Sequence, residues 1–559
     1  MTLWQEINQD LIKKALSEFS FEEMLPIKET QDHYILKIND DLYYKFKATK
    51  SIWNHLRVHG DIQRIESHKE TNLNAQQFFI DINIYIKTSD ITLSNYLEEI
   101  NNTLYSDLEI KNQTITSDEI LKLNGDNQQC FLSGHPKLLP NKGRIGFSSK
   151  DLDQYAPESR NPIQFRWVLV KKEKLKGLDL TPDTLWTIDQ SFSIEDEKIH
   201  ILKQIESKLD VYDLMPIHPW QWDNVIKMQF QDELQNETLI DLGVAGDSYL
   251  PQASIRTLSN ITSPKKYDIK VPVSILNTSC VRGLPHKYLS ITPKLSFEME
   301  NIVQNDELLK SVIILKEMKA VALEQNHFHQ IKDAAYRYHE QLGAVWRESS
   351  QLNSRSILSG VLIHQDHSGK TVFESYLDAS GLSASEWLKK YAQTVVLPLY
   401  HLQAKYGIGL VSHGQNIMVQ LKDSAPCGLV LKDFHGDLRL AKGSESVASH
   451  KELTKLPPEH LIHDLYTGHF ITVLRFLSGT LEDRNIISET DFYKIFATVI
   501  EGYGKTNPAI DLLQPTFPKV LVNKVRFQIG YGDNAKRPIP MLGSEINNPL
   551  YLSLRKESL

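Results

Sequence analysis

The spacing of apolar residues changes along this 559-residue chain, and that change limits the folds open to it. Between about residues 126 and 305, short apolar runs such as "QFRWVLV" and "IKVPVSIL" alternate with Pro and Gly turns, which predicts a region rich in antiparallel sheet. From about residue 305 onward, "LLKSVIILKEMKAVALEQ", "DAAYRYHEQLGAVW" and "WLKKYAQTVVLPLYHLQAKYG" place apolar residues at helical spacing. Since one hydrophobic core rarely serves so long a chain, we expect an α+β protein of several lobes.

The N-terminal segment is expected to form a scaffold domain. Apolar residues recur at helical spacing from Leu3 to Phe19, and "QQFFIDINIYIKT" alternates like a strand. A polar stretch at 114–129, "TITSDEILKLNGDNQQ", has the composition of a linker. These patterns predict three domains, 1–125, 126–305 and 306–559, of which the last is rich in helix.

The composition describes an ordinary, mildly acidic globular surface. Charged residues make up 24% of the chain and the net charge is −8, so there is no electrostatic reason to expect nucleic acid or an anionic membrane as a partner. Three widely spaced cysteines form no CxxC pair, which is usual in a reducing compartment. The N-terminus lacks the features of a signal peptide, and no apolar run is long enough to span a bilayer. We therefore expect a cytoplasmic protein without a membrane partner.

A polar hairpin is predicted within the helix-rich C-terminal part. Residues 417–421 and 429–431 have the pattern of two strands, joined by a turn that contains Pro426 and Gly428. Pairing of these strands would bring Asn416 and Asp433 together at the open end. An amide oxygen and a carboxylate are hard ligands, suited to Mg²⁺ and the phosphate oxygens that it bridges.

This layout is similar to that of protein kinases, in which an Asn and a DFG Asp hold metal ions across a hairpin. A kinase also needs a catalytic Asp five residues before that Asn, and this position is Val411. The Gly-rich phosphate loop, the V-A-I-K strand and the Walker pattern are missing from the sequence as well. From the hairpin alone, an ATP–Mg²⁺ site with a different chemistry, a small-molecule phosphotransferase and a purely structural hairpin all stay open.

Other segments collect cations and hydroxyl groups that suit an anionic ligand. They are His135, Lys142 and Arg144 in "LSGHPKLLPNKGRIGFS", Ser254, Arg256 and Thr257 in "SIRT", and Lys270, Thr278 and Arg282 in "IKVPVSILNTSCVRG". The structural alternatives are solvated loop cations and arginines paired with internal acids. The sequence has no HExxH and no GxSxG pattern, so zinc-dependent and serine-type hydrolysis have no support.

Taken in order, "GHPKLLPNKGR", "SIRT", "NTSCVR", "SHGQN" and "LKDFHG" resemble the motif series of the NRPS-independent siderophore synthetases of the aerobactin synthetase type. "PKVLVNKVRF" at 518–527 resembles the basic C-terminal segment of that family, whereas the first 125 residues match only in length and position. The resemblance implies a cupped hand with thumb, fingers and a distantly kinase-like palm. It also implies that ATP and Mg²⁺ serve to adenylate a carboxylate of citrate or of a citrate derivative such as a monoamide. Adenylation would release pyrophosphate, and an amine or hydroxyl group would then attack the acyl-adenylate and release AMP.

The resemblance implies a role for each matching residue. Nucleotide binding falls to His135, Lys142, Ser254, Arg256, Thr257, Lys270, Asn416 and Asp433, with Asn416 and Asp433 as metal ligands. Carboxylate binding falls to Thr278, Arg282, His413 and Gln415, with Lys519, Lys524 and Arg526 as further candidates from the C-terminal segment. Arg282, His413 and Lys270 are the expected catalytic groups, since cations beside the reacting phosphorus stabilise its transition state.

Some positions depart from the family pattern. Leu138 and Leu139 replace a second His-Pro pair, Val411 stands where an acidic residue is common, and Lys432 replaces an arginine before the aspartate. These departures keep open a non-catalytic paralogue that only binds a citrate-like metabolite. The resemblance also allows a homodimer, and it leaves the acceptor amine or hydroxyl undefined.

Overall fold

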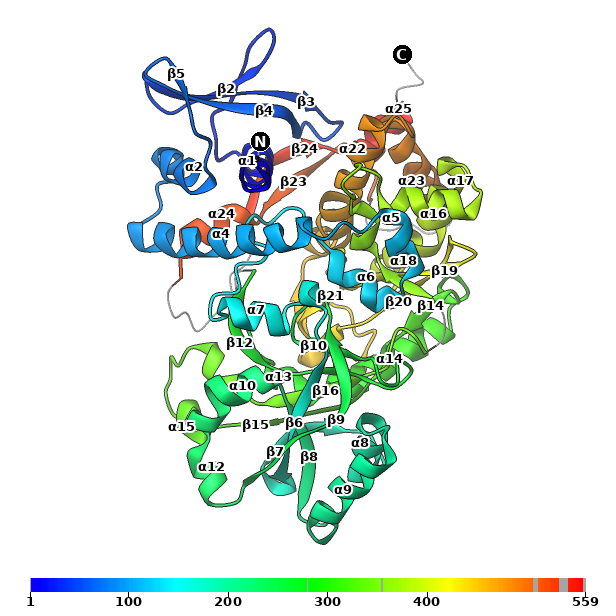
Figure 1. Ribbon diagram of the computed structural model, residues 1–559. Helices are drawn as coiled ribbons and strands as arrows, with labels where there is room; N and C mark the ends of the chain where they lie inside the picture. Colours follow the sequence, from blue (N-terminus) through cyan, green and yellow to red (C-terminus); the bar gives the residue numbers. More distant parts are fainter. Residues whose placement is uncertain (1, 279, 353–354, 506–510, 532–540, 556–559) are drawn as a thin grey trace.

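The computed structural model describes residues 2–278, 280–352, 355–505, 511–531 and 541–555. Figure 1 shows an N-terminal sheet with its helices at the upper left, a larger sheet at the bottom and a helix-rich region at the upper right. Each region contains a large hydrophobic cluster. The fold is a mixture of helix and sheet, as predicted. Within the described ranges, no helix has both the length and the apolar composition needed to cross a membrane.

The N-terminal region packs one long helix against a five-stranded antiparallel sheet. Helix α1 (Leu3–Phe21) begins at Thr2, whose side chain forms a capping box with Gln5. Helix α4 (Asp90–Lys111) packs against α1. In sheet order, the strands are β1 (Lys28–Glu29), β2 (Tyr34–Lys37), β3 (Leu42–Lys50), β4 (Leu56–Glu66) and β5 (Lys69–Thr71).

The segment "QQFFIDINIYIKT" forms two short helices, α2 (Ala75–Asp81) and α3 (Asn83–Ile86), so the prediction of a strand is wrong. Asn74 caps α2 by accepting a hydrogen bond from the backbone N–H of Gln77. The helical period prevails over the alternation because it buries four apolar residues on one face. These residues are Ala75, Phe78, Phe79 and Ile82.

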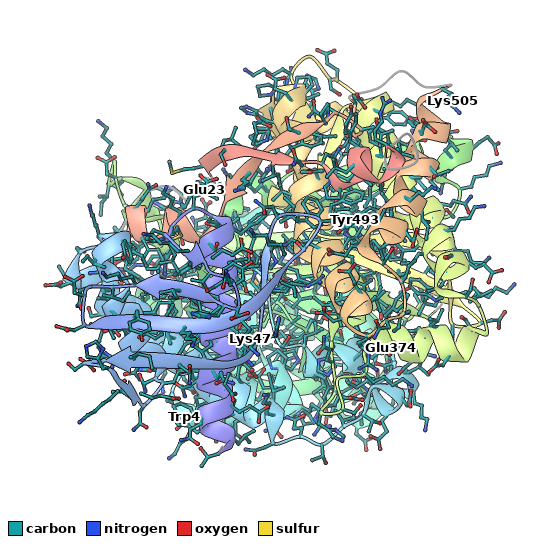
Figure 2. The ribbon with its side chains drawn as sticks, turned by 90° about the horizontal axis from the view of Figure 1, so that it is seen from above. Trp4, Glu23, Lys47, Glu374, Tyr493 and Lys505 are labelled. Carbon is teal, nitrogen blue, oxygen red and sulfur yellow. The ribbon has the colours of Figure 1, made fainter. Side chains whose placement is uncertain are left out.

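The N-terminal sheet also contacts the helices of the C-terminal region. In Figure 2, the strand that carries Lys47 lies beside the helix that carries Tyr493, which is α23 (Glu489–Gly504). The indole N–H of Trp53, between β3 and β4, donates to the Tyr493 hydroxyl across 2.7 Å. Segments more than 400 residues apart in the sequence are thus held together by a buried hydrogen bond.

The middle region is an eight-stranded sheet in which neighbouring strands are antiparallel, as predicted. Its order is β7-β15-β16-β11-β10-β9-β6-β8. The strands are β6 (Ile163–Lys171), β7 (Leu175–Asp179), β8 (Tyr212–Ile217), β9 (Leu239–Pro251), β10 (Thr257–Asn260), β11 (Asp268–Lys270), β15 (Glu317–Leu323) and β16 (Gly343–Arg347).

Two strands of this sheet come from segments that we predicted to be helices. "LLKSVIILKEMKAVALEQ" forms β14 (Val312–Ile314) and β15, and "DAAYRYHEQLGAVW" ends in β16. Every residue of β16 and most of β15 are buried, so both faces of these strands are covered. A strand that is buried on both faces need not alternate between apolar and polar residues, so periodicity cannot separate it from a buried helix. The sheet therefore continues past residue 305.

The C-terminal region surrounds a four-stranded sheet of order β14-β20-β19-β17. Its remaining strands are β17 (Ser356–Leu358), β19 (Ile417–Lys422) and β20 (Ala425–Leu431). The predicted helix before the hairpin is confirmed as α17 (Ala384–Tyr391), a π-helical turn and α18 (Leu397–Tyr406), which ends at the left-handed Gly407. A smaller sheet joins β18 (Ile408–Leu410), β21 (Leu438–Ala441) and β22 (Thr454–Leu456).

The predicted hairpin forms, but its turn lies elsewhere. Asp423 and Ser424 make the turn with positive φ angles of 51° and 61°, whereas Pro426 and Gly428 belong to β20. Two consecutive left-handed residues suit the right-handed twist of a hairpin. Gly428 serves a close approach, because a Cβ atom there would lie 2.4 Å from the carbonyl oxygen of Ser311 next to β14.

Buried neutral histidines predict that this fold is less stable in mild acid. His469 donates from Nδ1 to the carbonyl of Ser412 (3.0 Å) and accepts at Nε2 from the Tyr391 hydroxyl (2.8 Å). Burial lowers the pKa of His55 and of His469 to about 4. The unfolded chain therefore binds protons first as the pH falls below about 6.5, and stability is lost between about pH 6.5 and pH 4.

At pH 5.5 each such histidine is expected to remove roughly 1 kcal/mol of folding free energy. Thermal unfolding at fixed ionic strength should show a midpoint that falls steadily from pH 7.5 to pH 5.5. Replacement of the exposed His59 by Gln should leave this dependence unchanged. A midpoint that is constant across the range would contradict the prediction.

Candidate functional site

Five segments that lie far apart in the sequence meet around one cavity of about 310 Å³. They are the loop 133–144, the β9–β10 connection, the hairpin of β12 (Val273–Asn277) and β13 (Cys280–Arg282), the turn after β17, and the loop between β18 and β19. The predicted site residues that line it are His135, Lys142, Ser254, Thr278, Arg282, His413 and Gln415. The structure thus brings seven of the predicted residues to one place.

Two histidines on one side of the cavity are oriented by backbone N–H groups. The Nδ1 atom of His135 accepts from the N–H groups of Lys137 and Leu138, both at 3.2 Å. The Nδ1 atom of His413 accepts from the N–H of Gln415 at 3.3 Å. The rings pack edge to face, 6.2 Å apart. Because Nδ1 accepts in both rings, Nε2 carries the proton and is the donor.

Burial keeps both imidazoles neutral. It lowers the pKa of His135 well below the ordinary value, and the neighbouring His413 adds to this effect. Burial also lowers the pKa of His413, although Asp437 opposes the shift. Gly414, beside His413, packs against Gly360, where an added Cβ would lie 2.9 Å from the Gly360 Cα. Because position 414 is glycine, the backbone next to His413 can pack closely against the turn after β17.

The hydroxyl and guanidinium side of the cavity is built on strained turns. Ile255 and Thr278 have positive φ angles of 69° and 46°. Ser254 Oγ accepts from the backbone N–H of Thr257 at 3.1 Å, while Thr257 itself is buried at the start of β10. The Nε atom of Arg282 is buried and has no hydrogen-bond partner among the described residues. An unpaired buried donor of this kind indicates a missing acceptor.

A network of buried charges adjoins the cavity and contains predicted and unpredicted residues. Lys270 Nζ and Arg347 Nη1 approach the same Asp433 oxygen at 2.9 and 3.0 Å. Arg347 Nη2 also lies 3.0 Å from Asp268. Asp433 has a left-handed φ of 59°, so the chain turns sharply there after β20. Burial lowers the pKa of Lys270 and, together with Arg347, lowers that of Lys432 to about 8.

Three members of this network, Arg347, Asp268 and Asp126, were not predicted. Arg347 ends β16, which we had expected to be helical, so its position beside Asp433 could not be foreseen. Asp126 lies in the segment expected to be a linker; burial and the nearby Asp268 raise its pKa to about 7. Lys432 was noted in the sequence only because it directly precedes Asp433, and no role was predicted for it. The only sequence signal for these residues was that charged side chains occur at the ends of strands.

Asn416 lies at the same end of the hairpin as Asp433, since Ile417 pairs with Leu431. Its amide nitrogen donates to the Val411 carbonyl (3.0 Å) and to Asp437 (3.2 Å). The amide oxygen is the remaining acceptor of this side chain, and amide and carboxylate oxygens such as those of Asn416 and Asp433 are of the type that suits Mg²⁺ bound mainly through phosphates. Among the described residues, no three His, Cys, Asp or Glu side chains form a metal-binding group.

Two basic residues of the loop 133–144 are already paired with acids. Lys142 is buried, and its Nζ lies 2.7 Å from Asp107 on α4. Arg144 and Glu158 are both buried and share two hydrogen bonds, one of 3.0 Å. These contacts give both cations a structural partner at the edge of the cavity.

The C-terminal candidates are not among the residues that line the cavity. Lys519 pairs with Glu23 at 2.8 Å. The backbone N–H of Lys524 binds Glu22 at 3.0 Å, at the start of α24 (Asn523–Ile529). Arg526 pairs with a buried glutamate on α4 and lies 3.6 Å above the centre of the Tyr531 ring. In this structure the segment binds α1 and α4.

Comparison with known proteins identifies relatives over the whole chain. The profile of the "IucA / IucC family" matches residues 126–364, and the profile described as "Ferric iron reductase FhuF-like transporter" matches residues 385–534. Aerobactin synthase of Vibrio mimicus is 33% identical over 99% of this chain and 98% of its own length. Aerobactin synthase of Escherichia coli is 32% identical over 98% of both chains.

Solved structures show the same fold. Aerobactin synthetase IucC from Klebsiella pneumoniae has a TM-score of 0.86 and 29% identity, with 99% of both chains covered. The ATP-bound aerobactin synthetase IucA from the same organism has a TM-score of 0.80 at 17% identity, with 97% of this chain and 99% of that chain covered. Identity above 30% over nearly the whole chain, with a matching profile and fold, shows that this protein belongs to the IucA / IucC family of siderophore synthetases.

Proposed function

We propose that this protein uses ATP to adenylate a carboxylate of citrate or of a citrate derivative and condenses the acyl-adenylate with an amine or hydroxyl group. The observation that carries the proposal is the single cavity shared by His135, Ser254, Arg282 and His413. A polyanionic acid and a nucleotide can be held together only where donors and cations offset their repulsion. The aerobactin synthases and the ATP-bound relative support this choice.

We propose that different residues in and beside the cavity bind the nucleotide and the acid. We assign the nucleotide phosphates to His135, Ser254 and Arg256, with Lys270 and Asp433 beside them, and the carboxylate to Thr278, Arg282, His413 and Gln415. Neutral His135 and His413 each present an Nε2–H donor, which suits an anionic oxygen without requiring a proton transfer. The paired Lys142, Lys519 and Arg526 are given no direct role.

The proposed reaction begins when a carboxylate oxygen of the acid attacks the α-phosphorus of ATP. The bond to the β-phosphate breaks, and pyrophosphate leaves. Arg282 and Lys270 would stabilise the negative charge that develops on the phosphoryl oxygens. When bound by Asp433 and the Asn416 oxygen, Mg²⁺ would neutralise phosphate charge. The amine then attacks the acyl carbon, AMP leaves, and the amine proton passes to solvent.

We further propose that the predicted domains 1–125, 126–305 and 306–559 correspond to the thumb, fingers and palm of a cupped hand, with the end of the fingers moved beyond residue 305 because β15 and β16 belong to the middle sheet. The hairpin that brings Asn416 and Asp433 to the same end supports a distant relation of the palm to kinases. Val411 occupies the position of the kinase base. Attack by a carboxylate needs no such base, because the attacking oxygen is already ionised.

Analysis of the nucleotide products tests this proposal. Purified protein is incubated with Mg-ATP, hydroxylamine and either citrate, 2-oxoglutarate or a citrate monoamide. We expect AMP, pyrophosphate and one hydroxamate. ADP and phosphate would instead indicate a phosphotransferase. Tight calorimetric binding of the acid without nucleotide consumption would indicate a binding paralogue.

A further inference from the structure

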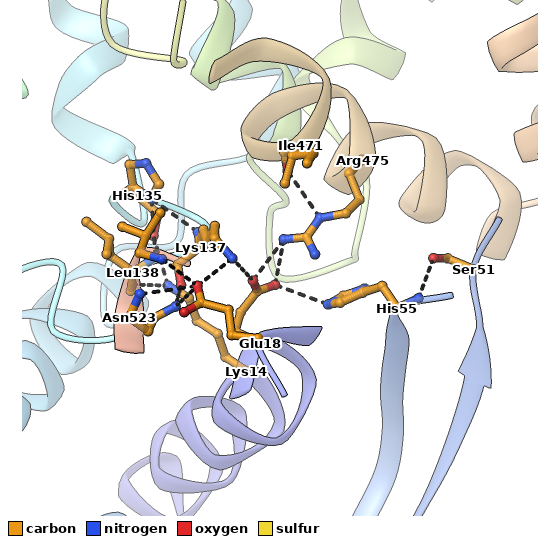
Figure 3. Close-up of polar contacts among 12 residues, drawn as sticks. Lys14, Glu18, Ser51, His55, His135, Lys137, Leu138, Ile471, Arg475 and Asn523 are labelled. Carbon is orange, nitrogen blue, oxygen red and sulfur yellow. Dashed lines mark hydrogen bonds and ion pairs between the residues drawn. The ribbon is translucent and has the colours of Figure 1, made fainter. Parts of the chain in front are cut away.

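The loop that presents His135 to the cavity is held from behind by the N-terminal helix. Lys14, on α1, donates from Nζ to the carbonyl oxygens of His135 (2.9 Å) and Leu138 (2.7 Å). Figure 3 shows these contacts on the inner side of the loop, with the His135 ring directed away from Lys14. One ammonium group thereby joins both ends of the turn that contains the imidazole.

A buried ion cluster fixes α1 behind this loop. Glu18, one helical turn after Lys14, lies 2.8 Å from Arg475 on α22 (Arg475–Asp483), 3.4 Å from Lys137 and 3.1 Å from His55 on the β3–β4 connection. Burial alone would favour the neutral acid, but Arg475 and Lys137 hold the pKa of Glu18 well below its ordinary value. Helix α1 is therefore locked to three regions of the chain (Figure 3).

Side chains take the place of regular secondary structure in this loop. The carbonyls of Ser133 and His135 accept from Asn141 at 3.1 and 3.2 Å. The Lys137 carbonyl accepts from Asn523 at 3.2 Å. Four carbonyls of this loop, those of Ser133, His135, Lys137 and Leu138, are thus bound by side chains, and the N–H groups of Lys137 and Leu138 donate to the His135 ring. The imidazole can keep its orientation only while these carbonyls stay in place.

We propose that Lys14 is a positioning residue that acts through the His135 loop to set the affinity of the cavity for ATP. This inference rests on the proposed function, in which His135 binds nucleotide phosphate. Lys14 is not among the residues that line the cavity, so we assign it no contact with substrate. Burial and Lys142 lower its pKa to about 7, and an amine donates hydrogen bonds in either protonation state.

The test compares Lys14→Met with Lys14→Arg and Lys13→Met. Methionine keeps the length and apolar stem but removes the donors, so the KM for ATP should rise about tenfold, as for the loss of a charge-assisted hydrogen bond. The KM for the carboxylate should change less than threefold. Arginine should restore most of the ATP affinity, because Lys14 borders a second cavity of about 520 Å³ that has room for it. Lys13 pairs with Asp10 on its own helix and serves as the matched control.

A double-mutant cycle with His135→Ala separates positioning from a loss of stability. If Lys14 acts through His135, Lys14→Met should have less than a twofold effect on ATP affinity in the His135→Ala background. Equal effects in both backgrounds, or an unchanged KM for ATP in Lys14→Met, would overturn the inference. Failure of the wild-type protein to bind or consume ATP would instead refute the proposed function.

Discussion

Replacing Arg282 by alanine is expected to lower kcat/KM for the carboxylate at least about a hundredfold, with little loss of stability. The guanidinium borders the cavity, and its Nε atom is buried without a hydrogen-bond partner among the described residues. Removal of the side chain therefore breaks no described ion pair, while it deletes the cation that we propose stabilises the attacking carboxylate and the reacting phosphorus. The effect should appear in both KM for the acid and kcat, while ATP binding measured by calorimetry stays within about threefold of wild type.

Two further variants make this experiment specific. Arg282→Lys keeps the charge but loses the planar fork, so its activity should fall between wild type and alanine. Lys287→Ala removes an exposed cation a few residues away and should leave the rates unchanged. Pyrophosphate release gives the rates, and thermal unfolding gives the stability. Wild-type rates in Arg282→Ala would show that the carboxylate is bound elsewhere.

The short polar motifs could be predicted because each occupies a turn or loop with a recognisable local composition. His135, Ser254, Thr278 and His413 combine left-handed or glycine-bearing turns with donors, and such turns leave a signal in the local sequence. Their meeting in one cavity was implied by the family resemblance and not by any spacing. The sequence therefore predicted the kind of side chain in each turn, but it did not predict which turns lie close together in the structure.

Arg347 shows why the remainder could not be predicted. Its strand, β16, is buried on both faces and has a helical appearance in the sequence. Only the pairing of β16 with β11 brings Arg347 beside Asp268, and only the hairpin brings Asp433 to both. The same limitation applies to Lys14, whose partners are backbone carbonyls more than 100 residues away. Contacts between residues so far apart in the sequence depend on how strands and helices are arranged in the fold, which local sequence patterns do not specify.

The charge at Asp433 is expected to be essential for both activity and stability. Asp433→Asn should reduce turnover about a thousandfold, because it removes the carboxylate that holds Lys270 and Arg347 and would bind Mg²⁺. It should also lower the free energy of unfolding by about 3–5 kcal/mol, since two buried cations lose their shared anion. Asp423→Asn, in the exposed turn of the same hairpin, should change neither property, because Asn tolerates the left-handed backbone found there.

A double variant separates the two roles of Asp433. In Asp433→Asn with Lys270→Met, the buried ammonium is removed together with the carboxylate, so much of the lost stability should return. Turnover should not return, because both groups that we assign to the phosphates are missing. Denaturant unfolding and pyrophosphate release measure the two properties on the same samples. If activity recovered along with stability, Asp433 would be a structural residue only, and the metal and phosphate site would have to lie elsewhere in the cavity.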